Sequence, residues 1–178
     1  MKDYIEILQN GGIGIIATDT IYGIVGQALR RKTVDRIYNV KKRTPTKPFI
    51  ILISKIADLE KFSIHLTEFS KSAVERYWPG PVSIILDCTN PDLEYLHRGT
   101  NSLAFRMPAD ESLQSLISRS GPLVAPSANP EGLTPAQTID EAKSYFGNSV
   151  DFYVEGTVSS KPSRIIKITN DSEEIIRP

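Results

Sequence analysis

Apolar and polar residues follow one another along the chain in patterns that predict many short helices and strands. Apolar residues at helical spacing predict helices at residues 4–8, 33–42, 66–78, 111–118 and 138–146. Short runs rich in Ile, Val and Leu predict strands at residues 13–17, 49–53, 82–86, 103–107, 123–125, 151–154, 164–168 and 174–176.

Several local signals fix the ends and faces of these predicted helices. Thr33 is a residue type favoured at a helix N-cap, so it is expected to cap the second helix. Prolines 79 and 81 end the third helix, and Gly147 ends the last one. The residues expected to face the core from the third helix are Phe69, Ala73, Val74 and Tyr77.

Strands and helices intermix along the whole chain, which favours one layered α/β or α+β structure. Residues 82–86 and 103–107 are predicted as successive strands with no helix between them, so the sheet should be mixed rather than purely parallel. A chain of 178 residues is long enough for about one domain. We therefore predict a single α/β domain over residues 1–178 with a mixed sheet.

Composition excludes several classes of protein. The chain is 40% hydrophobic and 24% charged, as is usual for a soluble globular domain. Its apolar runs, such as residues 49–53, fall far short of the ~20 residues that a membrane-spanning helix needs. Residues 1–6 lack the apolar centre of a signal peptide, and the single Cys88 has no disulfide partner. We expect a cytoplasmic protein that does not bind a membrane.

Positive charge is concentrated in one segment, residues 30–47. This segment has eight basic residues and one acid, Asp35, hence a net charge of +7, whereas the remaining 160 residues carry −7. The run is either a solvated helix face or an anion site. Two prolines at positions 45 and 48 stiffen the backbone beside the cations Lys41, Lys42, Arg43 and Lys47, and cations that are held in place suit phosphate or carboxylate recognition.

Common catalytic and metal motifs are missing from the sequence. There is no P-loop, and the glycines at positions 11, 12 and 14 do not fit the dinucleotide-binding pattern, so they are expected to end the first helix. His65 and His97 stand at no metal-ligand spacing, and Ser127 does not lie in a nucleophile elbow. Cys88 is interpreted as a small buried residue.

Three polar segments remain next to predicted strands: residues 17–23, 125–132 and 161–163. Each is rich in residues that favour turns, and turn formation alone is one reading. Because all three adjoin short strands, their polar groups are also able to converge on one sheet edge. Facing the held cations, such a rim of hydroxyls and amides would form a nucleotide pocket.

Five segments together resemble the YrdC-like family, the threonylcarbamoyl-AMP synthases of tRNA modification. Each segment alone is weak, but five in order at compatible spacing, across nearly the whole chain, are specific. They are residues 18–23 (TDTIYG), 41–43 (KKR), 77–82 (YWPGPV), 105–108 (FRMP) and 127–129 (SAN).

The resemblance implies a fold and a reaction. The fold would be an open, twisted mixed sheet with flanking helices around a concave cleft. The reaction would condense L-threonine, bicarbonate (or CO2) and ATP to threonylcarbamoyl-AMP and pyrophosphate. The product would pass to a transferase complex that makes N6-threonylcarbamoyladenosine at position 37 of tRNA.

The resemblance also implies roles for particular residues. A K-x-R/S-x-N group would carry catalysis: Lys41, Arg43, Ser127 and Asn129. ATP would contact Arg43, Lys47, Ser102, Ser127, Pro135 and Arg177. L-Threonine would contact Thr20, Arg106, Ala125 and Ser163.

Mg2+ is expected with ATP, although no ligands for it are identifiable in the sequence. The chain is expected to be a monomer or a homodimer, and tRNA contact through residues 30–47 is an open expectation. Two alternatives remain: a tRNA- or double-stranded-RNA-binding module without catalysis, and a related carbamoyl-adenylate enzyme with another acceptor. The basic segment favours the first alternative, since phosphate contacts dominate RNA affinity.

Overall fold

The computed structural model describes residues 4–159, 161–169 and 171–178. The helices are α1 (Tyr4–Gln9), α2 (Arg31–Lys41), α3 (Glu68–Tyr77), α4 (Glu94–His97), α5 (Glu111–Ser120) and α6 (Ile139–Phe146). Short 3-10 helices are η1 (Ile56–Phe62), η2 (Pro91–Leu93) and η3 (Gly147–Ser149). The strands are β1 (Gly14–Ala17), β2 (Tyr22–Gln27), β3 (Ile50–Leu52), β4 (Val82–Asp87), β5 (Ser102–Arg106), β6 (Leu123–Val124), β7 (Phe152–Val154), β8 (Arg164–Ile168) and β9 (Glu173–Arg177).

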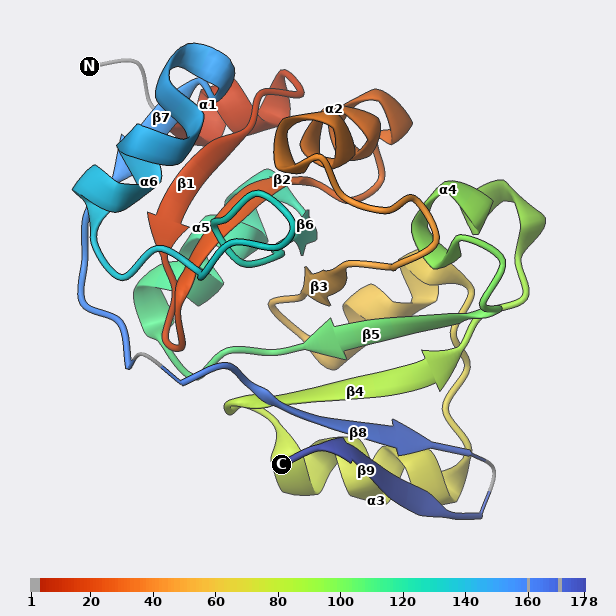
Figure 1. Cartoon of the computed structure of the whole chain (residues 1–178). Coiled ribbons are helices and arrows are strands. Elements are labelled where there is room, and N and C mark those ends of the chain that lie inside the picture. The colour runs from red at the N-terminus through yellow and green to blue at the C-terminus, as the bar shows by residue number, and fades with distance from the viewer. Residues whose placement is uncertain (1–3, 160, 170) are drawn as a thin grey trace.

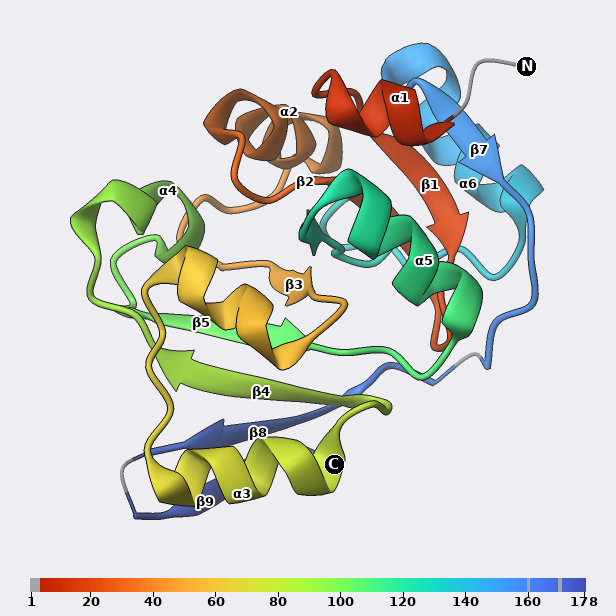
Figure 2. The same cartoon turned by 180° about the vertical axis from the view of Figure 1, so that it is seen from behind.

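The nine strands form one mixed sheet in the order β7-β1-β2-β6-β3-β5-β4-β8-β9. Strand pairs β1–β7, β3–β5 and β4–β8 are parallel, and the other neighbours are antiparallel. The prediction of a mixed sheet is therefore confirmed. Helices α2 and α6 lie on one side of the sheet, and α1, α3 and α5 lie on the other (Figures 1 and 2). The half of the sheet with β4, β5 and β8 has no helix on its front side in Figure 1.

The strand β1 is apolar on both faces because helices cover both faces of this part of the sheet. Successive side chains of a strand point to opposite faces. Accordingly, Ile15 belongs to the large core on one side, whereas Ile16 belongs to a second core with Leu8 and Leu116 on the other. A continuous apolar run of this kind is the pattern expected of a strand buried on both faces.

Strand β2 is the element that the hydrophobic pattern missed. It forms a hairpin with β1, in which Ala17 pairs with Tyr22 and Gly14 pairs with Val25. Two glycines, Gly23 and Gly26, interrupt its apolar run, and glycine is depleted in strands. The hydrophobic pattern therefore does not predict this strand. The pattern also missed η1, and it missed η2 and α4, which lie between β4 and β5.

Two predictions about helix residues were wrong. Thr33 does not cap α2 but lies inside it, buried, and its hydroxyl donates a hydrogen bond to the carbonyl of Gly11 (2.9 Å). Phe69 is 38% exposed rather than inward-facing, while Ala73 and Val74 on the same helix are buried as predicted. Phe69 lies in the first turn of α3, where a helix has fewer packing neighbours than in its middle. Helical spacing alone therefore does not predict whether its side chain is buried.

Gly26 lets helix α2 approach strand β2 closely. A Cβ atom at this position would lie 2.6 Å from Thr33 Cγ2 and 3.0 Å from Ile13 Cγ2, both closer than van der Waals contact permits. A side chain of any size therefore forces the helix away from the sheet.

We expect Gly26→Ala to lower the free energy of unfolding by about 1–3 kcal/mol, because overpacking a tight interface costs that much. Urea unfolding measures the change. Ser72→Ala, at an exposed position of α3, is the control and should stay within about 0.5 kcal/mol of the unchanged chain. Equal stability of the two variants would contradict the close packing of α2 on β2.

The two histidines and the cysteine behave as predicted. His97 is buried, with Nε2 3.3 Å from the carbonyl of Asn90 and Nδ1 accepting from the backbone N–H of Gly99. His65 is exposed, and Cys88 is buried with its thiol 3.5 Å from the carbonyl of Phe62. Within the described ranges, no group of three or more metal-ligating side chains occurs, and no helix has the length and apolarity to cross a bilayer.

Candidate functional site

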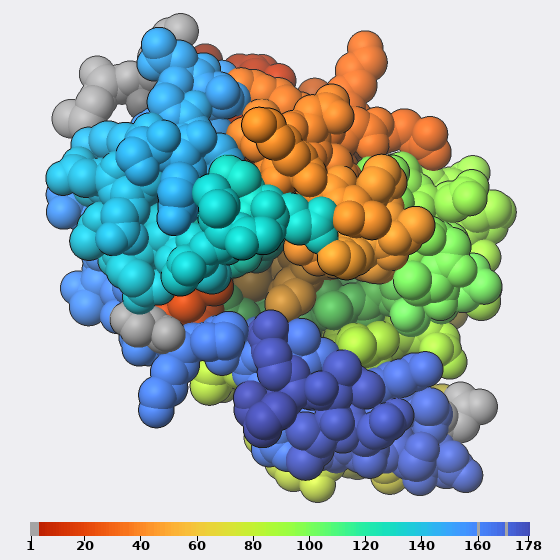
Figure 3. Space-filling view, in the orientation of Figure 1, coloured from red at the N-terminus to blue at the C-terminus, as the bar shows by residue number. Residues whose placement is uncertain are grey.

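The three polar segments that the sequence singled out meet at one cavity of about 330 Å³. The first segment follows β1, the second follows β6, and the third precedes β8. Figure 3 shows the hollow between the loop after β6 (cyan) and the C-terminal strands (dark blue). The residues of these segments that line the cavity are Thr18, Thr20, Ile21, Gly23, Ala125, Pro126, Ser127, Pro162 and Ser163. The predicted convergence is thus confirmed.

Sheet pairing brings the first two segments together. The carbonyl of Pro126 accepts from the backbone N–H of Ile24 (2.9 Å), and Ala128 donates to the carbonyl of Tyr22 (2.8 Å). Gly23 and Ser127 form an antiparallel bridge. We call residues 125–132, which follow β6, the Ser127 loop. The missed strand β2 is therefore the element that holds the Ser127 loop beside the Thr18–Thr20 turn.

Hydroxyl groups shape the turn after β1. The Thr18 Oγ1 atom accepts hydrogen bonds from the backbone N–H groups of Thr20 (3.2 Å) and Ile21 (3.3 Å). It also lies 3.0 Å from Thr20 Oγ1. Thr18 and Thr20 are both buried. This segment therefore forms a turn and also lines the pocket, as the two interpretations of its sequence predicted, because the turn itself is a wall of the cavity.

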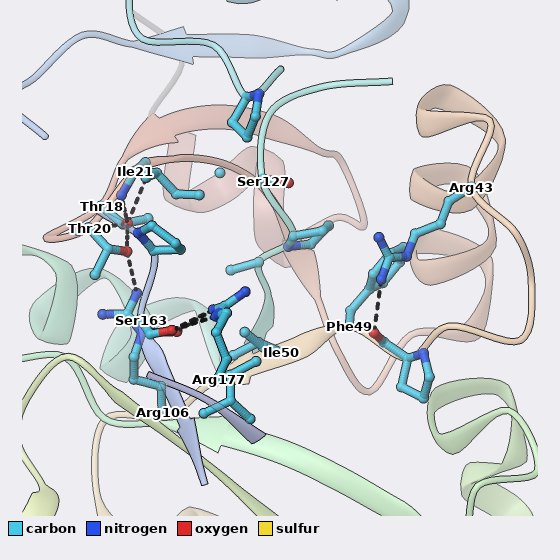
Figure 4. A pocket seen from close by; sticks show the side chains of 17 residues that line it. Thr18, Thr20, Ile21, Arg43, Phe49, Ile50, Arg106, Ser127, Ser163 and Arg177 are labelled. Carbon is cyan, nitrogen blue, oxygen red and sulfur yellow. Dashed lines mark hydrogen bonds between the residues drawn. The ribbon is translucent and has the colours of Figure 1, made fainter. Parts of the chain in front are cut away.

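Arg106, at the end of β5, lies directly against this turn and lines the cavity together with it (Figure 4). Its guanidinium makes an ion pair with Asp19 (2.5 Å) and lies 3.4 Å from the hydroxyl of Thr20. The side chain is only 4% exposed. A guanidinium has five N–H donors, so two contacts leave donors that remain for a ligand.

The C-terminal strand contributes a second arginine. Arg177 Nε donates to the carbonyl of Ser163 (2.9 Å), and Arg177 Nη2 lies 3.3 Å from the Ser163 hydroxyl. That hydroxyl in turn lies 2.8 Å from the hydroxyl of Ser83 on β4. Burial lowers the pKa of Arg177, but an arginine stays charged near neutral pH. A cation and a hydroxyl are thus fixed together at this wall.

A third arginine comes from the turn after α2. Lys42 ends the helix in the left-handed conformation (φ 50°), and the backbone N–H of Arg43 bonds to the carbonyl of Tyr38 (3.0 Å). The guanidinium donates to the carbonyl of Lys47 (3.2 Å) and lies 5.3 Å from the ring centre of Phe49. The sequence prediction that this cation is held in place is confirmed.

Lys41 is positioned differently from the sequence expectation. It is 1% exposed and does not line the cavity. Its ammonium donates to the carbonyls of Ser127 and Asn129, and lies 3.4 Å from Asn129 Oδ1. Burial and, second, the charge of Arg43 lower the pKa of Lys41 to about 7, while Glu131 acts in the opposite direction. Lys41 therefore stabilises the Ser127 loop through its backbone carbonyls, from a buried position outside the cavity lining.

The Ser127 loop is closed by its own side chains. The hydroxyl of Ser127 donates to Asn129 Oδ1 (2.6 Å), and Asn129 Nδ2 donates to the carbonyl of Leu133 (2.6 Å). Ser127 lines the cavity, whereas Asn129 lies outside its lining and orients Ser127. Asn129 therefore acts through Ser127 in this arrangement.

The structure brings most of the predicted site residues to this cavity, but not all of them. Those that line it are Thr20, Arg43, Arg106, Ala125, Ser127, Pro135, Ser163 and Arg177. Lys47 instead makes an ion pair with Glu131, and Ser102 lies at the start of β5 with its hydroxyl near Thr100 (3.5 Å). Contact of Lys47 and Ser102 with ATP stays a prediction.

Sequence reasoning missed two acids beside the site, Asp19 and Glu131. Asp19 stands within the quoted segment 18–23, but nothing in the local pattern tells that its partner is Arg106, 87 residues away. Glu131 follows Asn129 in the Ser127 loop, and its partners lie 84 and 87 residues away. No signal in a single sequence pairs such distant residues.

Three guanidiniums from three distant segments line one cavity, and no carboxylate in the described parts of the chain lines it. Such a cavity favours an anionic ligand, and arginines bind phosphate and carboxylate groups in a bidentate manner. Fold and site together define an α/β protein with a cleft whose lining suits a small anionic ligand.

The chain belongs to the Sua5/YciO/YrdC family, which is described as "Telomere recombination" and whose profile matches residues 6–178. The family expected from the sequence is thus confirmed.

Curated relatives and a solved structure carry consistent names. A Marinobacter nauticus relative, "Threonylcarbamoyl-AMP synthase", is 30% identical over 167 residues (92% of this chain and 88% of the relative). A Bacillus subtilis relative of the same name is 30% identical and covers 97% of this chain, but only 51% of its own length is matched. The structure "P. abyssi Sua5 complexed with L-threonine" superposes with a TM-score of 0.90 at 28% identity, covering 98% of this chain and 52% of that one. The chain therefore spans about half the length of the latter two proteins, and the expected fold is confirmed.

Proposed function

We propose that this chain is an L-threonylcarbamoyladenylate synthase, a nucleotidyltransferase that condenses L-threonine, bicarbonate and ATP and releases pyrophosphate. The family and the names of its relatives support this activity. The observation that carries the proposal for this chain is the convergence of Arg43, Arg106 and Arg177 on one cavity with the hydroxyls of Thr20, Ser127 and Ser163. Three anionic groups take part in the reaction: a carboxylate, a carbamate and a triphosphate.

The amino acid binds at the Arg106 end of the cavity. Its carboxylate pairs with the guanidinium donors of Arg106 that Asp19 and Thr20 leave free. The hydroxyls of Thr20 and Ser163 and the backbone at Ala125 supply the remaining contacts. Ile50 and Ile165 line the same cavity and offer apolar contact to the side-chain methyl group.

The nucleotide binds toward Arg43, Ser127, Pro135 and Arg177. The amine of threonine adds to the carbon of CO2 and gives up a proton to solvent, or it condenses with bicarbonate and releases water. The resulting carbamate oxygen attacks the α-phosphorus of ATP. The bond from the α-phosphorus to the bridging oxygen breaks, and pyrophosphate leaves with its electron pair. Arg43 and Arg177 offset the negative charge that builds on the phosphoryl oxygens in the transition state.

Mg2+ enters in this proposal as part of the substrate, bound to the ATP phosphates. The cavity walls offer guanidiniums, hydroxyls and carbonyl oxygens. Mg2+ in nucleotide sites commonly takes its ligands from substrate phosphates and water, with few protein groups. This donor set is compatible with a magnesium ion that arrives with the nucleotide.

We also propose that the product is consumed by a transferase complex that modifies adenosine 37 of tRNA. Direct tRNA contact would use the cations of residues 30–47 that face outward. Arg36 is paired with Asp151 and Lys47 with Glu131, whereas Arg30, Arg31, Lys32 and Lys42 are exposed. These four residues are available for phosphate contact.

The proposed activity predicts pyrophosphate release that requires ATP, bicarbonate and L-threonine together. Radiolabelled bicarbonate measured in the nucleotide product gives the stoichiometry. Release without threonine would contradict the proposal and favour an enzyme with another acceptor. Absence of release, with retained RNA binding, would favour a binding module.

A further inference from the structure

Two loops border the nucleotide end of the cavity and carry its polar groups. We call residues 42–48 the cation loop and residues 127–133 the amide loop. Arg43 and Pro48 of the cation loop line the cavity, and so does Ser127 of the amide loop. Figure 4 shows Arg43 on one side of the cavity and Thr18 and Thr20 on the other. The geometry of the site thus depends on how these two loops are held together.

Glu131 joins the two loops through one carboxylate. Its Oε2 atom accepts from the backbone N–H of Thr44 (2.5 Å) and from the hydroxyl of Thr44 (2.8 Å). Its Oε1 atom pairs with the ammonium of Lys47. Both oxygens are therefore used, and both bind the cation loop.

The backbone at Glu131 is fixed as well. Its N–H donates to the carbonyl of Lys41 (2.8 Å), the last residue of α2, while the Lys41 ammonium binds carbonyls in the same loop. Pro130 precedes it, and Gly132 follows it in the left-handed region (φ 89°). The carboxylate is therefore aimed from a rigid turn.

Glu131 pairs with Lys47 and not with Arg43, the cation of this loop that lines the cavity. Lys47 has its charge opposite Glu131, whereas Arg43 is held by carbonyl oxygens and faces the cavity. Glu131 itself does not line the cavity. A small displacement of a positioned group is able to cost about 10²-fold in rate. A carboxylate outside the cavity is thus able to affect the reaction rate by setting the position of a group that lines the cavity.

We propose that Glu131 is a positioning residue that ties the cation loop to the amide loop and thereby sets Arg43 against Ser127. The effect on the reaction rests on the proposed synthase function, but the tie between the loops does not.

The first test measures the tie without any substrate. In Glu131→Ala, hydrogen exchange of the Thr44 amide is expected to speed up at least tenfold, because the amide loses its acceptor. Glu131→Gln keeps a carbonyl acceptor and should stay within about threefold of the unchanged chain. Glu75→Ala, exposed on α3 and outside the cavity, is the matched control and should change nothing. Unchanged exchange at Thr44 in Glu131→Ala overturns the proposal.

The second test measures whether Glu131→Ala impairs the use of ATP more than the use of L-threonine. Glu131→Ala is expected to lower kcat/KM for ATP by about 10- to 100-fold while KM for L-threonine stays within twofold, because the threonine end is built on other segments. Glu131→Gln should recover most of the loss. Equal losses for both substrates, together with a lower Tm, would indicate a merely structural role and overturn the proposal. If the unchanged chain releases no pyrophosphate, the proposed function fails. The positioning role is then tested by ATP affinity, measured by calorimetry, which is expected to fall by the same 10- to 100-fold in Glu131→Ala.

A double variant separates Lys47 as part of the tie from Lys47 as a direct nucleotide contact. Adding Lys47→Ala to Glu131→Ala is expected to change kcat/KM for ATP by less than twofold, since the tie is already broken. A further tenfold loss would mean that Lys47 contacts the nucleotide itself and that Glu131 only neutralises it, which overturns the positioning role.

Discussion

Replacing Arg43 by alanine is expected to lower kcat/KM for ATP about 10²- to 10³-fold while the chain stays folded. Removal of one preorganised donor to a developing negative charge costs about this much in other enzymes. Arg43 is only partly buried, and its contacts within the chain are to the carbonyls of Lys47 and Pro48 and the ring of Phe49. Its loss therefore removes little from the fold. Initial rates at varied ATP measure the effect, and circular dichroism measures the folding.

Arg43→Lys is the informative companion variant. It keeps the charge but loses the planar fork, so it should recover part of the rate and not all of it. Lys71→Ala, an exposed cation of α3 outside the cavity, should leave the rate unchanged. A rate in Arg43→Ala within threefold of the unchanged chain would remove Arg43 from the site.

Lys41→Met is expected to lower pyrophosphate release by about 10²-fold, although Lys41 does not line the cavity. Methionine keeps the length of the side chain but donates no hydrogen bond. The carbonyls of Ser127 and Asn129 and the Asn129 side-chain oxygen then lose their buried donor. The loop that presents Ser127 loosens as a result. Hydrogen exchange in residues 127–133 should rise together with the loss of activity.

The same variant tests the pKa of Lys41 through the pH dependence of stability. The pKa of Lys41 is about 7 in the folded chain against an ordinary value of 10.5. Between these two values the unfolded chain binds more protons at this lysine, so the free energy of unfolding rises with pH. Below about 7 both states are protonated and the slope vanishes.

We therefore expect the stability of the unchanged chain, minus that of Lys41→Met, to increase between pH 7 and 9. The slope has an upper bound of about 1.4 kcal/mol per pH unit. Urea unfolding of both chains over this range measures it, and groups other than Lys41 cancel in the difference. Parallel stability curves would mean that Lys41 titrates at its ordinary pKa, and retained activity in Lys41→Met would contradict its support of the Ser127 loop.

Local patterns were sufficient for most elements of the fold. The apolar runs at residues 82–86 and 164–168 predicted strands that pair in the structure as β4 and β8. Helix spacing predicted α3, α5 and α6, because their apolar faces are buried against the sheet. The pattern failed at β2 because Gly23 and Gly26 interrupt its apolar run, and Gly26 is present for the close approach of α2 rather than for strand propensity.

The site divides in the same way. The sequence by itself determined which segments carry polar groups next to strands and which residues resemble the family motifs. Only the tertiary structure decided that Lys41 lies buried beneath the Ser127 loop, that Asp19 pairs with Arg106, and that Glu131 joins two loops. Residue types and spacing report on neighbours within a few positions, whereas these contacts join residues more than 80 positions apart. Their geometry follows from the order of strands in the sheet, which no local pattern encodes.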